Sequence, residues 1–138
     1  MVAVHLNWVA VLAAAFTVYV LGAIWYSPVA FARPWGRLIG MTEEQMRGAG
    51  ASPAIALIVQ AVVTVITAAT LAVVVAWSGA GNPFEGASVG LLLGIGLIVA
   101  DHAKLVAFEH RPLALFAINN VYTLLALMVI GAIEGTWR

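Results

Sequence analysis

The sequence has very little charge and no cysteine. Of its 138 residues only 9% are charged, six basic and six acidic, whereas 64% are hydrophobic. A soluble domain carries about 25% charged and 45–50% apolar residues, so this composition excludes an ordinary water-soluble globule. The formal net charge is zero, which gives no reason to expect a nucleic acid as partner. The absence of cysteine excludes a disulfide, a thiol nucleophile and a thiolate metal site.

Catalytic and metal-binding motifs are also missing. The three histidines, His5, His102 and His110, do not have the spacing of a metal site within one chain, so we expect no metal and no cofactor. No Ser-His-Asp constellation, phosphate-cradling glycine loop or HExxH motif is found. We therefore expect that the protein is not an enzyme.

Long stretches without charge predict membrane helices. Residues 1–32, 48–84, 86–100 and 112–133 carry no Asp, Glu, Lys or Arg. A helix needs about 20 mostly apolar residues to cross the hydrocarbon core. We predict an all-α, four-helix transmembrane bundle, a single integral membrane domain over residues 1–138, with spans at roughly 6–26, 53–77, 85–108 and 112–135. No Lys or Arg precedes the first apolar run, so we expect a retained helix rather than a cleavable signal peptide.

The long connection after the first span has a pattern of its own. Its apolar residues fall at helical spacing with two arginines between them: Phe31, Trp35, Leu38 and Ile39, with Arg33 and Arg37. This pattern predicts a short amphipathic segment lying in the membrane interface. Thr42 and Gln45 then match a capping box at the start of a helical turn.

Charge and tryptophan positions predict the orientation. Five of the six basic residues lie in the first and third connections: Arg33, Arg37, Arg47, Lys104 and Arg111. The positive-inside rule then places both connections in the cytoplasm and both termini outside, in a bacterial cytoplasmic membrane. All five tryptophans lie near predicted span ends, as interface anchors: Trp8, Trp25, Trp35, Trp77 and Trp137.

The third span is the one whose sequence forces charge into the membrane. Its charge-free stretch has 15 residues, too few to cross the hydrocarbon core, so we expect Asp101, His102 and Lys104 to lie below the cytoplasmic surface. Gly86, Gly90 and Gly94 recur every four residues and predict a close helix contact, within the bundle or between subunits. Asp101 lies seven residues after Gly94, a rotation of about 20° in an α-helix. We therefore expect Asp101 to share the glycine face and to be buried in protein.

Polar residues of the other spans fall at a similar depth. We predict a polar layer about 10 Å beneath the cytoplasmic face, formed by Tyr19, Gln60, Asp101 and Asn119 with Lys104 above it. Two interpretations stay open: a proton relay or cation site that uses Asp101, and a structural network in which Asp101 pairs with Lys104. Glu134 and Arg138, four residues apart at the outer end, are interpreted as a surface ion pair.

Two blocks of the sequence resemble a known family. The first block holds Asn7-Trp8, Gly22-Ala23-Ile24-Trp25-Tyr26-Ser27-Pro28, Phe31 and Trp35; the second holds Phe108-Glu109, Arg111, Leu115-Phe116-Ala117-Ile118-Asn119, Tyr122, Gly131-Ala132-Ile133 and Trp137. Both are similar to the signature of the bacterial domain-of-unknown-function 1761 family. The resemblance implies a four-helix membrane protein and no assigned activity.

These observations favour one function and leave a second open. We expect a non-enzymatic membrane protein, in contact with the lipid bilayer, that assembles with itself or is an accessory subunit of a larger membrane complex. The alternative is an oligomeric translocator of protons, cations or small solutes that uses the polar layer around Asp101.

Overall fold

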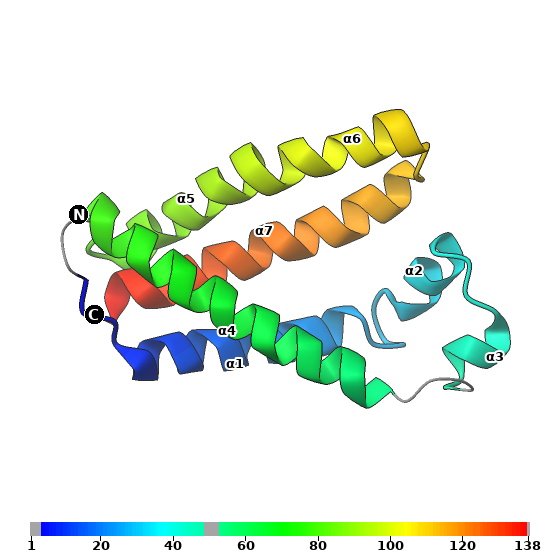
Figure 1. Cartoon of the computed structure of the whole chain (residues 1–138), viewed down its shortest axis with the longest axis horizontal. Helices are drawn as coiled ribbons and strands as arrows, with labels where there is room; N and C mark the ends of the chain where they lie inside the picture. The colour runs from blue at the N-terminus through cyan, green and yellow to red at the C-terminus, as the bar shows by residue number, and fades with distance from the viewer. Residues whose placement is uncertain (1–3, 49–52, 138) are drawn as a thin grey trace.

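Four long helical stretches run along the molecule (Figure 1). The computed structural model describes residues 4–48 and 53–137. In chain order, the helices of this part are α1 (Trp8–Trp25), α2 (Ala32–Leu38), α3 (Glu43–Met46), α4 (Pro53–Ser78), α5 (Pro83–Leu93), the π-helix η1 (Gly94–Val99), α6 (Ala100–Glu109) and α7 (Leu113–Thr136). α5, η1 and α6 follow one another directly and together make the third candidate span. The prediction of an all-helical protein with four membrane-spanning helices is confirmed.

Local capping signals set several helix ends. The side chain of Asn7 accepts hydrogen bonds from the backbone N–H groups of Val9 and Ala10 at the start of α1. Asn82 caps α5 in the same way, with proline at the first helical position. α6 ends at Glu109 and is followed by the cap residue His110, whose φ of 54° is left-handed, and α7 starts directly after Pro112. The last two spans are therefore joined by a tight turn.

The connection between the first two spans contains the predicted short helices. The amphipathic segment is α2, and the capping box begins α3. The Thr42 side chain accepts a hydrogen bond from the Gln45 backbone at 3.2 Å, and the Gln45 side chain accepts one from the Thr42 backbone at 2.9 Å. The predicted capping box is confirmed.

The hydrophobic core lies where α1, α4 and α7 meet. The buried residues of these three helices are mostly alanine and valine with a few larger side chains: Val11, Ala14, Ala15, Val18, Ala68, Leu71, Ala72, Val75, Ala126, Leu127 and Ile130. Small side chains let helices approach closely, which matters in a membrane because burial from lipid supplies little driving force.

The third span is attached differently, through its backbone. Gly86 and Gly90 of α5 lie directly against the carbonyl oxygens of Gly131 and Leu127 on α7, where a Cβ atom would overlap those oxygens. In its most apolar window only 6% of the third span is buried, against 28% for each of the other three. α7 is thus the main support of the third span, which otherwise faces outward.

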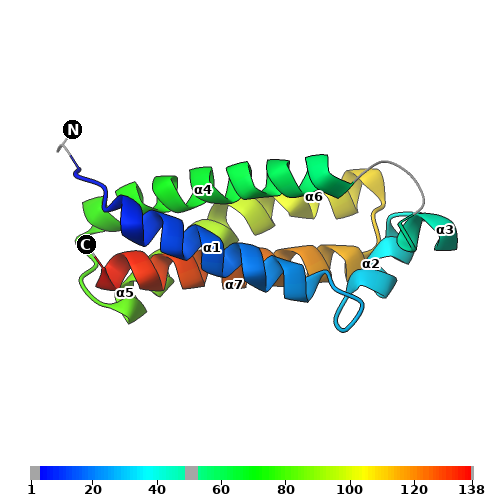
Figure 2. The same ribbon diagram turned by 90° about the horizontal axis from the view of Figure 1, so that it is seen from below.

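The two ends of the bundle differ. The start of α1 and the end of α7 lie at one end, whereas α2 and the turn between α6 and α7 lie at the other (Figures 1 and 2). Towards its Pro53 end, α4 diverges from α6 (Figure 1).

Candidate functional site

A cleft of about 670 Å³ lies between α1, α4, η1, α6 and α7, where α4 diverges. Most of its wall is apolar, and its polar lining comes from Tyr26, Gln60, Thr64, Thr67, His102, Asn119, Tyr122 and Thr123. The N-terminal half of α4 contributes exposed side chains to one wall. Polar groups at membrane depth that line a cavity are the usual mark of a functional or assembly site in a membrane protein.

A cluster of aromatic side chains lines the cleft near the end of α1. The Tyr26 hydroxyl donates to Oδ1 of Asn119 at 3.1 Å, and the Tyr122 hydroxyl donates to the Val18 carbonyl at 3.3 Å. The rings of Tyr26 and Tyr122 pack edge to face with centroids 5.4 Å apart. Tyr26 directly follows the span, and its burial, with a smaller contribution from Tyr122, raises its pKa to about 12. Tyr26 is therefore a hydrogen-bond donor throughout the physiological pH range.

A second polar contact joins the third and fourth spans. Nδ1 of His102 lies 2.9 Å from Oδ1 of the buried Asn120. The Asn120 amide nitrogen donates to the Phe116 carbonyl at 2.8 Å, so its oxygen is the acceptor facing the imidazole. This network assigns the proton to Nδ1 of His102.

The position of Asp101 differs from the prediction. Asp101 is exposed on the outside of the bundle and pairs with Lys104, with 64% and 66% of the two side chains exposed. The reason is η1: a π-helix accommodates one more residue in its turn than an α-helix does, and this shifts the following residues by about 100°. The residue that continues the glycine face is consequently His102, and the expectation that Asp101 is buried on that face is wrong.

The structure brings together only part of the predicted polar layer. Gln60 and Asn119 line the same cleft, whereas Asp101 and Lys104 face outward and the half-buried Tyr19 lies outside the cleft lining. The predicted polar layer did not include the cleft residues Tyr26, His102 and Tyr122. For His102 one signal was available in the sequence. The two glycines of Gly94-Ile95-Gly96, placed inside an apolar helix, favour a local departure from α-helical geometry, which changes the direction of the residues that follow.

The predicted packing glycines lie within the bundle. Gly86 and Gly90 contact the backbone of α7, and a Cβ on Gly94 would lie 2.7 Å from a side-chain carbon of Leu124. Gly131 and Gly135 of α7 face the same contact from the other side. This is a close helix contact between the third and fourth spans. The backbones of the two helices can approach each other because both have glycine, which has no side chain, at the contact.

Glu134 also differs from its prediction. Only 5% of this residue is exposed, and its Oε1 atom has no hydrogen-bond partner among the described residues. Glu134 lies four residues after Ile130 and therefore on the face of α7 that packs into the core. The interpretation as a surface ion pair is wrong in placing Glu134 at the surface, and Arg138 lies outside the described residues.

The tryptophans divide between the two ends. Trp8, Trp77 and Trp137 are exposed near the end that holds the start of α1 and the end of α7. Trp25 and Trp35 are half-buried at the opposite end, where the indole N–H of Trp25 donates to the Ile118 carbonyl at 3.2 Å. Within residues 4–48 and 53–137 there is no group of three His, Asp or Glu side chains that could hold a metal ion.

Comparison with known proteins places the chain in a family without giving it an activity. Neither the search of curated proteins nor the search of solved structures found a match. The model of one family, described as protein of unknown function (DUF1761), matches residues 9–135. Together with four candidate membrane helices, this match confirms the resemblance of the two sequence blocks: the chain belongs to the DUF1761 family.

Proposed function

We propose that this chain is a non-enzymatic membrane protein that assembles with itself through the outer face of α6. The observation that carries the proposal is the exposed ion pair of Asp101 and Lys104. Asp101 lies about 12 Å along the helix from Glu109, where the span ends. A charge at that depth is costly against lipid, and such residues nearly always face protein or a water-filled cavity.

A second copy is the partner that fits this pair. In a symmetric dimer the same surface of each copy meets itself, so Asp101 of one copy can face Lys104 of the other. Large exposed apolar side chains precede and follow the pair along the third span, with Leu97 66% and Phe108 83% exposed. The low burial of the third span leaves this surface free for such a contact.

The proposal includes an orientation. Arg33, Arg37, Arg47, Lys104 and Arg111 belong to the connections or to the helix end beside them, all at the end of the bundle opposite the start of α1 and the end of α7 (Figure 1). By the positive-inside rule this end faces the cytoplasm, with both termini outside the bacterial cytoplasmic membrane. A single cysteine at either end, tested for labelling by an impermeant maleimide in intact cells, checks this orientation.

Cysteine cross-linking tests the assembly, because the natural chain has no cysteine. Ala103→Cys places one thiol beside the ion pair, and Val62→Cys is the control on the exposed surface of α4. We expect oxidation in native membranes to give a disulfide-linked dimer for Ala103→Cys and none for Val62→Cys. Mass measurement in nanodiscs should give a dimer that Asp101→Asn with Lys104→Gln reduces to monomer. If the natural protein is monomeric, the proposal of self-assembly is wrong. If a different subunit co-purifies and binds at this surface, the chain is an accessory subunit instead.

A second candidate is translocation of protons, cations or small solutes, which the polar lining of the cleft favours. The group best placed for it is His102, since Asp101 lies outside the cleft. Flux into proteoliposomes that is lost in His102→Gln and Gln60→Leu, and kept in Asp101→Asn, would support translocation. Absence of flux in the natural protein would leave assembly alone.

A further inference from the structure

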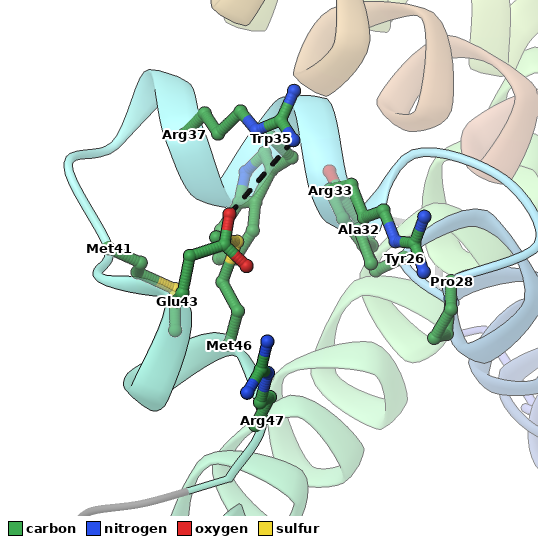
Figure 3. A pocket seen from close by; sticks show the side chains of 10 residues that line it. All are labelled: Tyr26, Pro28, Ala32, Arg33, Trp35, Arg37, Met41, Glu43, Met46 and Arg47. Carbon is green, nitrogen blue, oxygen red and sulfur yellow. Dashed lines mark ion pairs between the residues drawn. The ribbon is translucent and has the colours of Figure 1, made fainter.

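A second cavity, of about 460 Å³, lies beside the cleft at the end of the bundle that carries the connections. Figure 3 shows three arginines around it: Arg33 and Arg37 from α2, and Arg47 just after α3. Arg37 lies 4.0 Å from Glu43, a distance at which both exposed side chains interact weakly. Arg33 and Arg47 form no ion pair with another residue in the described part of the chain. The cavity therefore has a cationic lining that its one acidic residue does not neutralise.

The chemistry of this lining favours a phosphate group. Guanidinium groups bind phosphate oxygens in a planar, two-pronged geometry, and arginine is the residue that proteins use for this purpose. Trp35, Met41 and Met46 supply apolar surface beside the arginines. Basic pockets of this kind, next to membrane helices on the cytoplasmic side, bind the headgroups of anionic lipids.

The cationic cavity and the intramembrane cleft share two wall residues. Tyr26 and Trp35 line both of them, and their rings pack edge to face with centroids 5.5 Å apart. The cleft itself lies between α1, α4 and α7, and apolar side chains such as Val18, Leu57 and Val63 line it. A single molecule with an anionic head and an apolar tail could fill both spaces.

We propose that the two cavities form one binding site for an anionic phospholipid. The phosphate lies among Arg33, Arg37 and Arg47, and an acyl chain passes Tyr26 and Trp35 into the cleft. Free phosphate fits the arginines but has nothing to place in the cleft, so the two ligands are distinguishable. The site is on the opposite side of α6 from the Asp101–Lys104 pair and does not depend on self-assembly.

Native mass spectrometry of the whole 138-residue chain tests this site. Delipidated protein in detergent is mixed with phosphatidylglycerol or with the net-neutral phosphatidylcholine, and lipid adducts are counted per protomer. We expect one retained phosphatidylglycerol and little phosphatidylcholine. Arg33→Gln with Arg47→Gln should weaken phosphatidylglycerol retention about tenfold or more, since each basic residue near a membrane surface contributes about 1 kcal/mol towards an anionic lipid. Arg47→Gln alone, at an exposed position, should give a smaller loss in the same direction.

Two further variants separate the alternatives. Arg111→Gln is the matched control, because Arg111 lies at the same end of the bundle but pairs with Glu109 and does not line the cationic cavity. Ala56→Trp fills part of the cleft and should reduce lipid retention while Arg111→Gln does not. Equal retention of the two lipids, or no effect of the arginine substitutions, overturns the proposal. Displacement of the lipid by millimolar inorganic phosphate, with no effect of Ala56→Trp, would make it a site for free phosphate instead.

Discussion

Replacing Gly90 by alanine tests whether the glycine contact holds the third span in place. A Cβ atom on Gly90 would overlap the carbonyl oxygen of Leu127 and lie 2.6 Å from its carbonyl carbon, whereas ordinary contacts start at 3.4 Å. The atoms in the way belong to the backbone of α7, so no side-chain rotation can relieve the overlap. α5 and α7 must separate by roughly 1 Å to restore van der Waals distances.

The size of the effect follows from overpacking. One additional methyl group in a packed contact costs about 1–3 kcal/mol, and a rigid backbone neighbour puts this case at the upper end. The separation also loosens the reciprocal contacts of Gly131 and Gly135 with the start of α5. We therefore expect Gly90→Ala to lower the unfolding free energy by about 3 kcal/mol, which is about 10 °C in Tm for a chain of this length.

Gly96 provides the matched control. It belongs to the same span, is exposed, and has no atom within 4 Å of the position of a Cβ. Gly96→Ala should be neutral or stabilising by up to about 1 kcal/mol, because alanine favours helix over glycine. Thermal unfolding in detergent, followed by tryptophan fluorescence, measures both variants. If Gly90→Ala is tolerated as well as Gly96→Ala, the glycine contact does not determine the distance between these helices.

Four further predictions concern single groups. In a double-mutant cycle of His102→Phe and Asn120→Leu, the coupling free energy should be about 0.6–1.7 kcal/mol; a coupling near zero would contradict the hydrogen bond. Glu134→Leu should raise Tm, because it removes a buried carboxyl oxygen without a partner. The pKa of Tyr26 is raised to about 12 from 10, so its contribution to stability is complete below pH 10 and lost as pH rises through about 12; the tyrosinate absorbance that Tyr26→Phe removes measures this titration. Deletion of Gly96 should be tolerated, with the His102–Asn120 contact kept, because a π-helix corresponds to one inserted residue.

The number and approximate limits of the spans could be predicted from the sequence, because both depend on the hydropathy and charge of neighbouring residues and not on the fold. Hydropathy and charge-free length located four helices, and local hydrogen-bonding side chains such as Thr42 and Gln45 located helix starts. The packing glycines were also recognisable from their spacing, although the spacing did not say which helix they contact. Their partners, Gly131 and Gly135, are distant in sequence and close only in the fold.

The cleft could not be predicted, since it depends on how far α4 diverges from α6. Gln60 and Asn119 were identified by depth alone, and depth does not tell which way a side chain points. Tyr26 was interpreted only as part of a family signature, although its bond to Asn119 joins two residues 93 positions apart. Glu134 was assigned to the surface because its nearest charged neighbour in sequence, Arg138, suggested an ion pair. In the structure Glu134 is buried, because it lies on the face of α7 that packs into the core.

The π-helix η1 links these observations to the two proposed sites. In an uninterrupted α-helix, Asp101 would continue the glycine face and place a carboxylate beside the cleft, with His102 turned away. The additional residue of η1 reverses this choice, so that an imidazole faces Asn120 and the carboxylate faces outward beside Lys104. A carboxylate in the cleft would repel an anionic phospholipid, whereas on the outer face it can pair with a second copy. The same shift of one residue therefore favours both a cleft that accepts the lipid and a charged surface that accepts a partner.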